Sequence, residues 1–150
     1  MAADCPSGKN VLGSGGWVNQ GLDKVVMDQI VPNAALTRVT VAGRETEAGT
    51  SASWSLTAYA ICADPVAGLQ LLTATRFADS SATKNVTGLC PAGKNMTGIG
   101  AAIGGGAGEV LLDTVAPHIT MTGGQVGASE DVTGFSGNWS LTAYAICATP

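Results

Sequence analysis

The ten-residue stretch WSLTAYAICA occurs twice in this chain of 150 residues, at residues 54–63 and, without a change, at residues 139–148. Its side chains alternate, as they do in a strand that lies half-buried on a core. One face would carry the apolar set Trp54, Leu56, Ala58, Ala60 and Cys62. The other face is mixed, with Ser55, Thr57, Tyr59, Ile61 and Ala63. The stretch therefore predicts a β-strand whose first face packs on the core.

Two copies of one unit account for most of the chain. Residues 5–63 and 90–148 align without a gap at an offset of 85 positions, so that CPSGKN at residue 5 returns as CPAGKN at residue 90. The positions shared between these blocks include Gly13/Gly98, Gly15/Gly100, Asp28/Asp113, Pro32/Pro117, Glu45/Glu130 and Gly49/Gly134. We therefore divide the chain into a first β repeat unit at 1–63, bridging strands at 64–89 and a second β repeat unit at 90–150.

The composition is typical of a β-protein. Lys and Arg number 7 and Asp and Glu 11, whereas Ser, Thr, Val and 21 glycines are common. Exposed helix faces favour Glu, Lys and Arg, and sheets favour β-branched residues. We predict an all-β fold of two tandem homologous antiparallel sandwich or barrel units with pseudo-twofold symmetry and one disulfide each.

Charge and hydropathy exclude several partners. The net charge is −4 and the few cations are scattered, so nucleic acid is not an expected partner. No apolar run approaches about 18 residues, so no membrane span is predicted. Met1-Ala2-Ala3 resembles a start added to a mature chain. We expect a secreted, extracellular protein.

Each repeat carries two cysteines. A unit of about 60 residues buries only about 60% of its unfolded surface, so a crosslink would help to stabilise it. We favour Cys5–Cys62 and Cys90–Cys147, because each pair joins the first and last matching blocks of one copy. The rival pairing is Cys62–Cys90 with Cys5–Cys147. Free thiols and a metal site are weaker alternatives, since the chain has one histidine and no CxxC. No metal or cofactor is predicted.

Further strands follow from apolar, β-branched runs between turn signals. We expect them at residues 10–18, 24–31, 36–42, 69–77, 83–89, 95–103, 109–116 and 119–126, with a turn at the small-residue run 104–108. The bridging strands can pair completely with only one of the two repeats, so the other repeat would expose an unpaired sheet edge. Exposed edges invite pairing with another chain, and we therefore predict a homo-oligomer.

Two pairs of carboxylates recur, Asp28/Asp113 and Glu45/Glu130. Strand alternation would place Asp28 opposite Met27, on the solvent side or over a turn. A structural role is favoured, ligand contact is an alternative, and glycosidic cleavage would need two carboxyl groups roughly 5–10 Å apart. The single histidine, His118, follows a proline at a predicted turn, and no serine lies in a GxSxG elbow. We predict no catalytic residue and no enzyme.

The aromatic residues offer a candidate binding site. Trp54 and Trp139 begin the repeated strand, where core packing is favoured over a sugar platform. Trp17 differs, because its counterpart is Ala102 and the shared fold does not require a large ring there. A sugar offers C–H faces to a ring and hydroxyls to amides, whereas the alternative is an oligomer contact or a surface tryptophan. The candidate ligand-binding residues are Trp17, Asn19, Gln20, Asp28, Asp113, Glu45 and Glu130.

The CPxGK block, the glycine-rich strand and the closing AYAICA strand together resemble a known kind of module. Similar tandem modules occur in exported actinobacterial proteins and in distal parts of phage or collagen-like fibre proteins. The matching residues here are Cys5 to Asn10, Gly13, Gly15 and 54–63, with their counterparts in the second repeat. The usual glycine triplet is reduced to Gly13-Ser14-Gly15-Gly16 and Gly98-Ile99-Gly100. The resemblance implies an exported, β-rich, non-catalytic module.

The sequence therefore predicts an exported, non-enzymatic binding module of lectin-like character, with carbohydrate as its partner. The alternative is a structural or oligomerisation head module of a surface or fibre protein, whose partner is a copy of itself. A third possibility is a small glycoside hydrolase that uses the recurring carboxylates.

Overall fold

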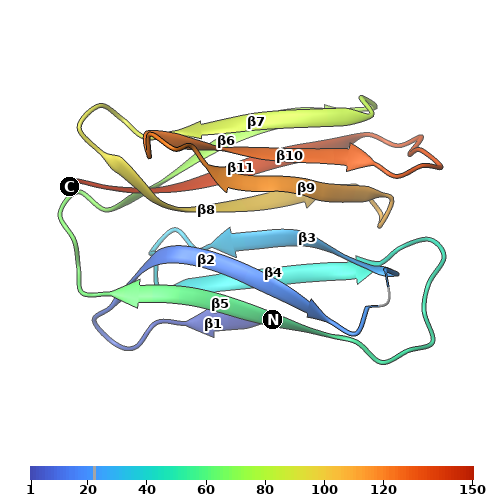
Figure 1. Cartoon of the computed structure of the whole chain (residues 1–150), viewed down its shortest axis with the longest axis horizontal. Coiled ribbons are helices and arrows are strands. Elements are labelled where there is room, and N and C mark those ends of the chain that lie inside the picture. Colours follow the sequence, from blue (N-terminus) through green and yellow to red (C-terminus); the bar gives the residue numbers. More distant parts are fainter. Residues whose placement is uncertain (22) are drawn as a thin grey trace.

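The structure is a computed structural model that describes residues 1–21 and 23–150. The described residues form eleven β-strands and no helix (Figure 1). The strands are β1 (Ala2–Asp4), β2 (Asn10–Asn19), β3 (Val25–Pro32), β4 (Arg38–Glu45), β5 (Ser55–Ala63), β6 (Gln70–Asp79), β7 (Thr83–Leu89), β8 (Asn95–Gly104), β9 (Val110–Pro117), β10 (Gly123–Glu130) and β11 (Trp139–Ala148). The fold is all-β, as the composition predicts.

The first sandwich consists of β1 to β5, in the lower half of Figure 1. Strands β1, β4 and β3 form one layer in that order, and β2 and β5 form the other. The core between the layers contains Val11 of β2 and Val39 and Val41 of β4, each fully buried. Leu56 and Ala58 pack against them from β5, on the face that the alternation predicts.

The second sandwich consists of β6 to β11, in the upper half of Figure 1. Its layers are β7-β10-β9 and β8-β11-β6, and both bridging strands pair within it. Its core includes Val126 of β10 and Leu141, Ala143 and Ala145 of β11, all fully buried. The repeat makes β7 the counterpart of β1, whereas β6 has no counterpart in the first sandwich.

The favoured disulfide pairing is confirmed. Cys5–Cys62 and Cys90–Cys147 each join residues 57 positions apart, with a Cα–Cα distance of 5.7 Å in both. Each bridge ties the block that precedes the glycine-rich strand, β2 or β8, to the strand that repeats unchanged. The two sandwiches are therefore crosslinked internally and not to each other.

The two sandwiches meet at a seam along β8. Strand β3 pairs with β8 at Gln29↔Ala102 and Ile30↔Ala101 only, and this pairing joins one layer of each sandwich into a six-stranded sheet with the order β1-β4-β3-β8-β11-β6. A Cβ on Gly98 would lie 2.6 Å from the carbonyl oxygen of Leu12, and one on Gly100 would meet that of Ile30. Both positions therefore require glycine, because the backbone of the first sandwich occupies the space of a side chain.

Two predicted strands begin at least two residues later than expected. Residues 36 and 37 belong to the turn before β4, where Leu36 has a φ of 52° and Asn33 Oδ1 accepts from the N–H of Thr37 at 2.8 Å. The equivalent strand of the second sandwich, β10, begins at Gly123 instead of residue 119, after Met121 with a φ of 57°. A left-handed residue fixes both turns and Asn33 adds side-chain hydrogen bonds in the first, and an apolar pattern alone does not reveal them.

Candidate functional site

The outer face of the β2–β5 layer presents exposed aromatic and apolar side chains to solvent. The pairs Gly13↔Ile61, Gly15↔Tyr59, Trp17↔Thr57 and Asn19↔Ser55 share this face, which we call the aromatic face. Trp17 is 60% exposed, Tyr59 53% and Ile61 68%. None of the eight residues of the aromatic face carries a charge.

Glycines make the aromatic face flat. A Cβ on Gly13 would lie 2.9 Å from Ile61 Cδ1, so the isoleucine side chain lies across the bare glycine. Gly15 is opposite Tyr59, two residue pairs along the ladder from Trp17 and on the same face. Diagonal neighbours in an antiparallel pair have Cα atoms about 7–8 Å apart, within reach of aromatic side chains. The two rings can therefore share one planar ligand.

Polar groups lie at the Trp17 end of the aromatic face. Asn19 Nδ2 donates to Thr57 Oγ1 at 3.1 Å, which fixes the amide beside Trp17. Gln20 follows the strand with an exposed side chain and a φ of 63°. The structure thus brings together three of the predicted site residues, Trp17, Asn19 and Gln20, at one end of β2.

Asp28 and Asp113 lie elsewhere, each in a β-bulge. The ladder between β3 and β4 shifts register around Asp28, and that between β9 and β10 shifts around Asp113. Each side chain pairs with a residue sixteen positions later: Arg44 Nε lies 2.6 Å from Asp28 Oδ2, and Ser129 Oγ donates to Asp113 Oδ2 at 2.6 Å. The aspartate that recurs in both repeats is therefore the bulged residue, and its side chain bonds within its own sandwich.

The predicted solvent orientation of Asp28 is wrong. Asp28 is only 4% exposed, and its Oδ1 has no hydrogen-bond partner among the described residues. The bulge places an extra residue in β3 and so breaks the strict alternation on which the prediction rests.

Glu45 and Glu130 hold the two tryptophans that begin the repeated strand. Trp54 Nε1 donates to Glu45 Oε1 at 2.9 Å, and Trp139 Nε1 donates to Glu130 Oε1 at 3.2 Å. Glu45 also accepts from the N–H of Thr50 at 3.2 Å. The hydrogen bond from the Trp54 indole N–H, and to a smaller extent the one from the Thr50 backbone N–H, lower the pKa of the Glu45 carboxyl below its ordinary value. Both glutamates therefore have a structural partner at the same place in the repeat.

Trp139 is a core residue and cannot serve as a sugar platform. Its ring is fully buried and packs in the core of the second sandwich. The buried ammonium group of Lys84 lies 4.7 Å from its centroid and forms an ion pair with Asp79. Core packing, the interpretation favoured from the sequence, is confirmed for this tryptophan.

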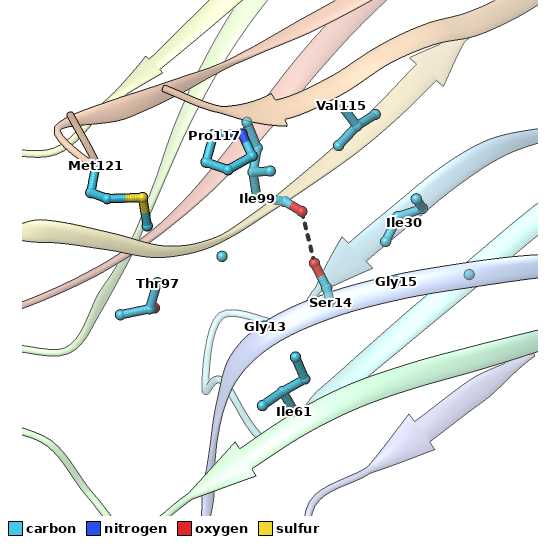
Figure 2. A pocket seen from close by; sticks show the side chains of 12 residues that line it. Gly13, Ser14, Gly15, Ile30, Ile61, Thr97, Ile99, Val115, Pro117 and Met121 are labelled. Carbon is cyan, nitrogen blue, oxygen red and sulfur yellow. Dashed lines mark hydrogen bonds between the residues drawn. The ribbon is translucent and has the colours of Figure 1, made fainter. Parts of the chain in front are cut away.

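An apolar groove, of which the sequence carries no direct sign, lies at the junction of the two sandwiches. Its volume is about 410 Å³, and it is lined by the glycine-rich run 13–16 of β2, by β8 and β9, and by the side chains of Ile30, Ile61 and Met121 (Figure 2). Ser14 Oγ donates to the carbonyl oxygen of Ile99 at 3.0 Å across the groove. A second cavity of about 290 Å³ shares Gly16, Ile30 and Val115 with it. With its serine already bonded, the groove offers few polar partners to a sugar.

Comparisons with protein-family models, with curated proteins and with solved structures found no match to this chain. Across residues 1–21 and 23–150, His, Cys, Asp and Glu form no group of three or more that could hold a metal ion. Within the same ranges, no helix is long and apolar enough to cross a membrane. The candidate site therefore stands on its own geometry.

Proposed function

We propose that this chain is an exported, non-enzymatic module of lectin-like character that binds a neutral carbohydrate on the aromatic face. The observation that carries the proposal is the exposure of Trp17. A 60% exposed tryptophan lies diagonally across the β2–β5 ladder from a 53% exposed tyrosine, on a layer flattened by glycines. The fold does not require this ring, since the second repeat has Ala102 in its place.

The chemistry of the aromatic face suits a sugar. The rings supply apolar surface for the C–H face of a pyranose, and the amides of Asn19 and Gln20 supply donors and acceptors for its hydroxyls. The absence of charged side chains from the aromatic face favours a neutral sugar over a uronic or sialic acid.

One site per chain follows from the arrangement of the sandwiches. The equivalent face of the second sandwich has Gly104 and Gly105 in place of Asn19 and Gln20. Ile146, the counterpart of Ile61, is fully buried on that face and packs with the core of the first sandwich. The second repeat therefore supplies a contact surface where the first presents the aromatic face.

Two further features support an exported binding module. Disulfides persist in oxidising compartments, and both bridges here close structural units. The recurring carboxylates are bonded to Arg44, Ser129, Trp54 and Trp139, which favours structural over catalytic work. A second candidate function, a self-associating head module of a surface or fibre protein, is favoured by the unpaired edge of β5.

Binding to an array of neutral and acidic oligosaccharides tests the proposal. We expect signal on neutral glycans, and loss of that signal in Trp17→Ala, which installs the residue that the second repeat has. Phe77→Ala is the matched control, because Phe77 is an 81% exposed aromatic residue on β6. Signal that persists in Trp17→Ala, or no signal on any glycan, would overturn the proposal.

A further inference from the structure

Strands β5 and β11 share one sequence but differ in how many neighbours they have. Strand β11 lies between β8 and β6, whereas β2 is the one strand that pairs with β5 across residues 1–21 and 23–150. On the core face, Leu141, Ala143 and Ala145 of β11 are fully buried, whereas the counterparts of these residues in β5 are half-buried. In β11, the edge that corresponds to the free edge of β5 pairs with β6, so this sequence accepts a further antiparallel strand on that side.

The free edge of β5 lacks the features that protect sheet edges. Its nine residues include no charge and no proline. Four other edge strands are short or carry charges. Strand β1 has three residues, β6 carries Arg76 and Asp79, β7 carries Lys84, and β9 carries Asp113 and ends in Pro117. Strand β2, which is also uncharged, lies against β8 at the seam. An uncharged edge strand of the length of β5 is a template for another strand.

We propose that the free edge of β5 pairs antiparallel with the β5 of a second copy of this chain, around a twofold axis at Tyr59. This register places Ala58 opposite Ala60 of the partner subunit. It also sets Leu56 opposite Cys62 and Thr57 opposite Ile61 between the copies. The apolar core face of one strand continues into that of the other, and no charges meet.

The pairing of β6 with β11 shows which residues this edge accepts. There Ala74 lies opposite Ala143 and Leu71 opposite Ile146. The self-paired β5 would again place alanine beside alanine, with uncharged side chains along the whole edge. A second copy therefore matches the residues that β11 accepts, and the symmetric register needs no other strand of the partner.

The dimer has a consequence for the aromatic face, and this consequence rests on the proposed function. A twofold axis perpendicular to the layer creates a continuous β2-β5-β5-β2 sheet with both aromatic faces on one side. Three strand spacings of about 4.8 Å separate the two copies of β2 by about 14 Å across the sheet. Two sites on one face would bind an extended polysaccharide with avidity.

Light scattering and sedimentation of the native chain test the dimer. An interface of one strand pair is small, so we expect a dimer that dissociates on dilution from hundreds of micromolar to low micromolar. A monomer mass throughout that range would overturn the proposal.

Charge exchange at Tyr59 tests the register. Tyr59→Lys and Tyr59→Glu each place like charges opposite each other, and each should weaken dimerisation by about a hundredfold. A mixture of the two variants should recover the dimer, because opposite charges then meet at the axis. Failure of the mixture to dimerise while each variant stays folded by circular dichroism would refute this pairing.

Two control variants distinguish the β5 edge from the rest of the surface. Phe77→Lys changes the exposed edge of β6 and should leave the dimer intact; dissociation of the dimer in this variant would assign the contact to β6 instead. Trp17→Ala removes the proposed sugar site and should still dimerise, and a monomeric Trp17→Ala would assign the contact to the aromatic face. The proposed dimer and the proposed carbohydrate site can therefore be refuted independently of each other.

Discussion

Strands β5 and β11 have the same nine residues from serine to alanine, but very different surroundings. In β11, Leu141, Ala143, Ala145 and Cys147 are fully buried, whereas their counterparts in β5 are half-buried. The bridging segment explains the difference, since it adds β6 beside β11 and β7 beside β10. Identical local sequence thus gives identical strands, and the number of neighbouring strands decides how deeply they are buried.

The largest difference between the two copies is expected at the tryptophan that begins the repeated strand. Trp139→Ala should lower the free energy of unfolding by about 3–5 kcal/mol, because it empties a fully buried site. Trp54 is half-buried, so Trp54→Ala should cost about 1–2 kcal/mol. Urea unfolding followed by circular dichroism measures both, and equal losses would contradict the comparison.

The disulfides should stabilise both sandwiches equally but differ in accessibility. Replacing either cysteine pair by alanine should cost about 4 kcal/mol in the chain-entropy account, since both loops have the same length. Cys147 is fully buried and Cys62 is half-buried, so a reductant should open Cys5–Cys62 first. Thiol labelling with peptide mapping gives the order, and earlier labelling of Cys90 and Cys147 would contradict the burial argument.

A smaller contrast is expected one step along the same strand. Ile146→Val should cost about 1 kcal/mol, because it deletes a methyl group from a fully packed site. Ile61→Val should change the stability of the monomer by less than about 0.5 kcal/mol, since Ile61 is exposed. Thermal unfolding at low micromolar concentration, where β5 is unpaired, measures both variants. A larger loss in Ile61→Val would mean that its side chain is buried in solution.

The smallest expected effect is a pH dependence at the surface glutamate of the first sandwich. The pKa of Glu45 is below its ordinary value of 4.5, because Trp54 and Thr50 donate to the carboxylate. Its contribution to stability is therefore complete above about pH 4.5 and decreases as the pH falls through the lowered pKa. Urea midpoints between pH 6 and pH 3 should fall less steeply in Glu45→Gln than in the native chain. Parallel curves would contradict the role of this hydrogen bond.

Much of the fold could be predicted from the sequence because the repeat supplies its own comparison. The alternation of residues 54–63 predicts the strand, and the matched blocks predict the bridges at Cys5 and Cys90. The bulge at Asp28 and the left-handed Leu36 could not be predicted, since both break the alternation on which strand prediction depends. The difference in burial between β5 and β11 depends on tertiary neighbours and leaves no local sign.

The candidate site was predictable only where its residues follow one another along the chain. Trp17, Asn19 and Gln20 lie together because one strand carries them. The contribution of Tyr59 depends on the register between β2 and β5, which alternation within either strand does not determine. A signal for the true role of Glu45 and Glu130 was present, because each precedes its tryptophan by nine positions in both repeats. The groove was not predictable, since its walls come from both sandwiches.

The glycines of the seam make the tandem a stiff block. At Gly98 and Gly100 main chain of one sandwich rests directly on main chain of the other, and at Gly108 it rests on the carbonyl of Glu45. Backbone contacts of this kind contain no rotatable side chain whose rearrangement would let one sandwich shift against the other. The two sandwiches should therefore move as one body when the module is placed under mechanical load.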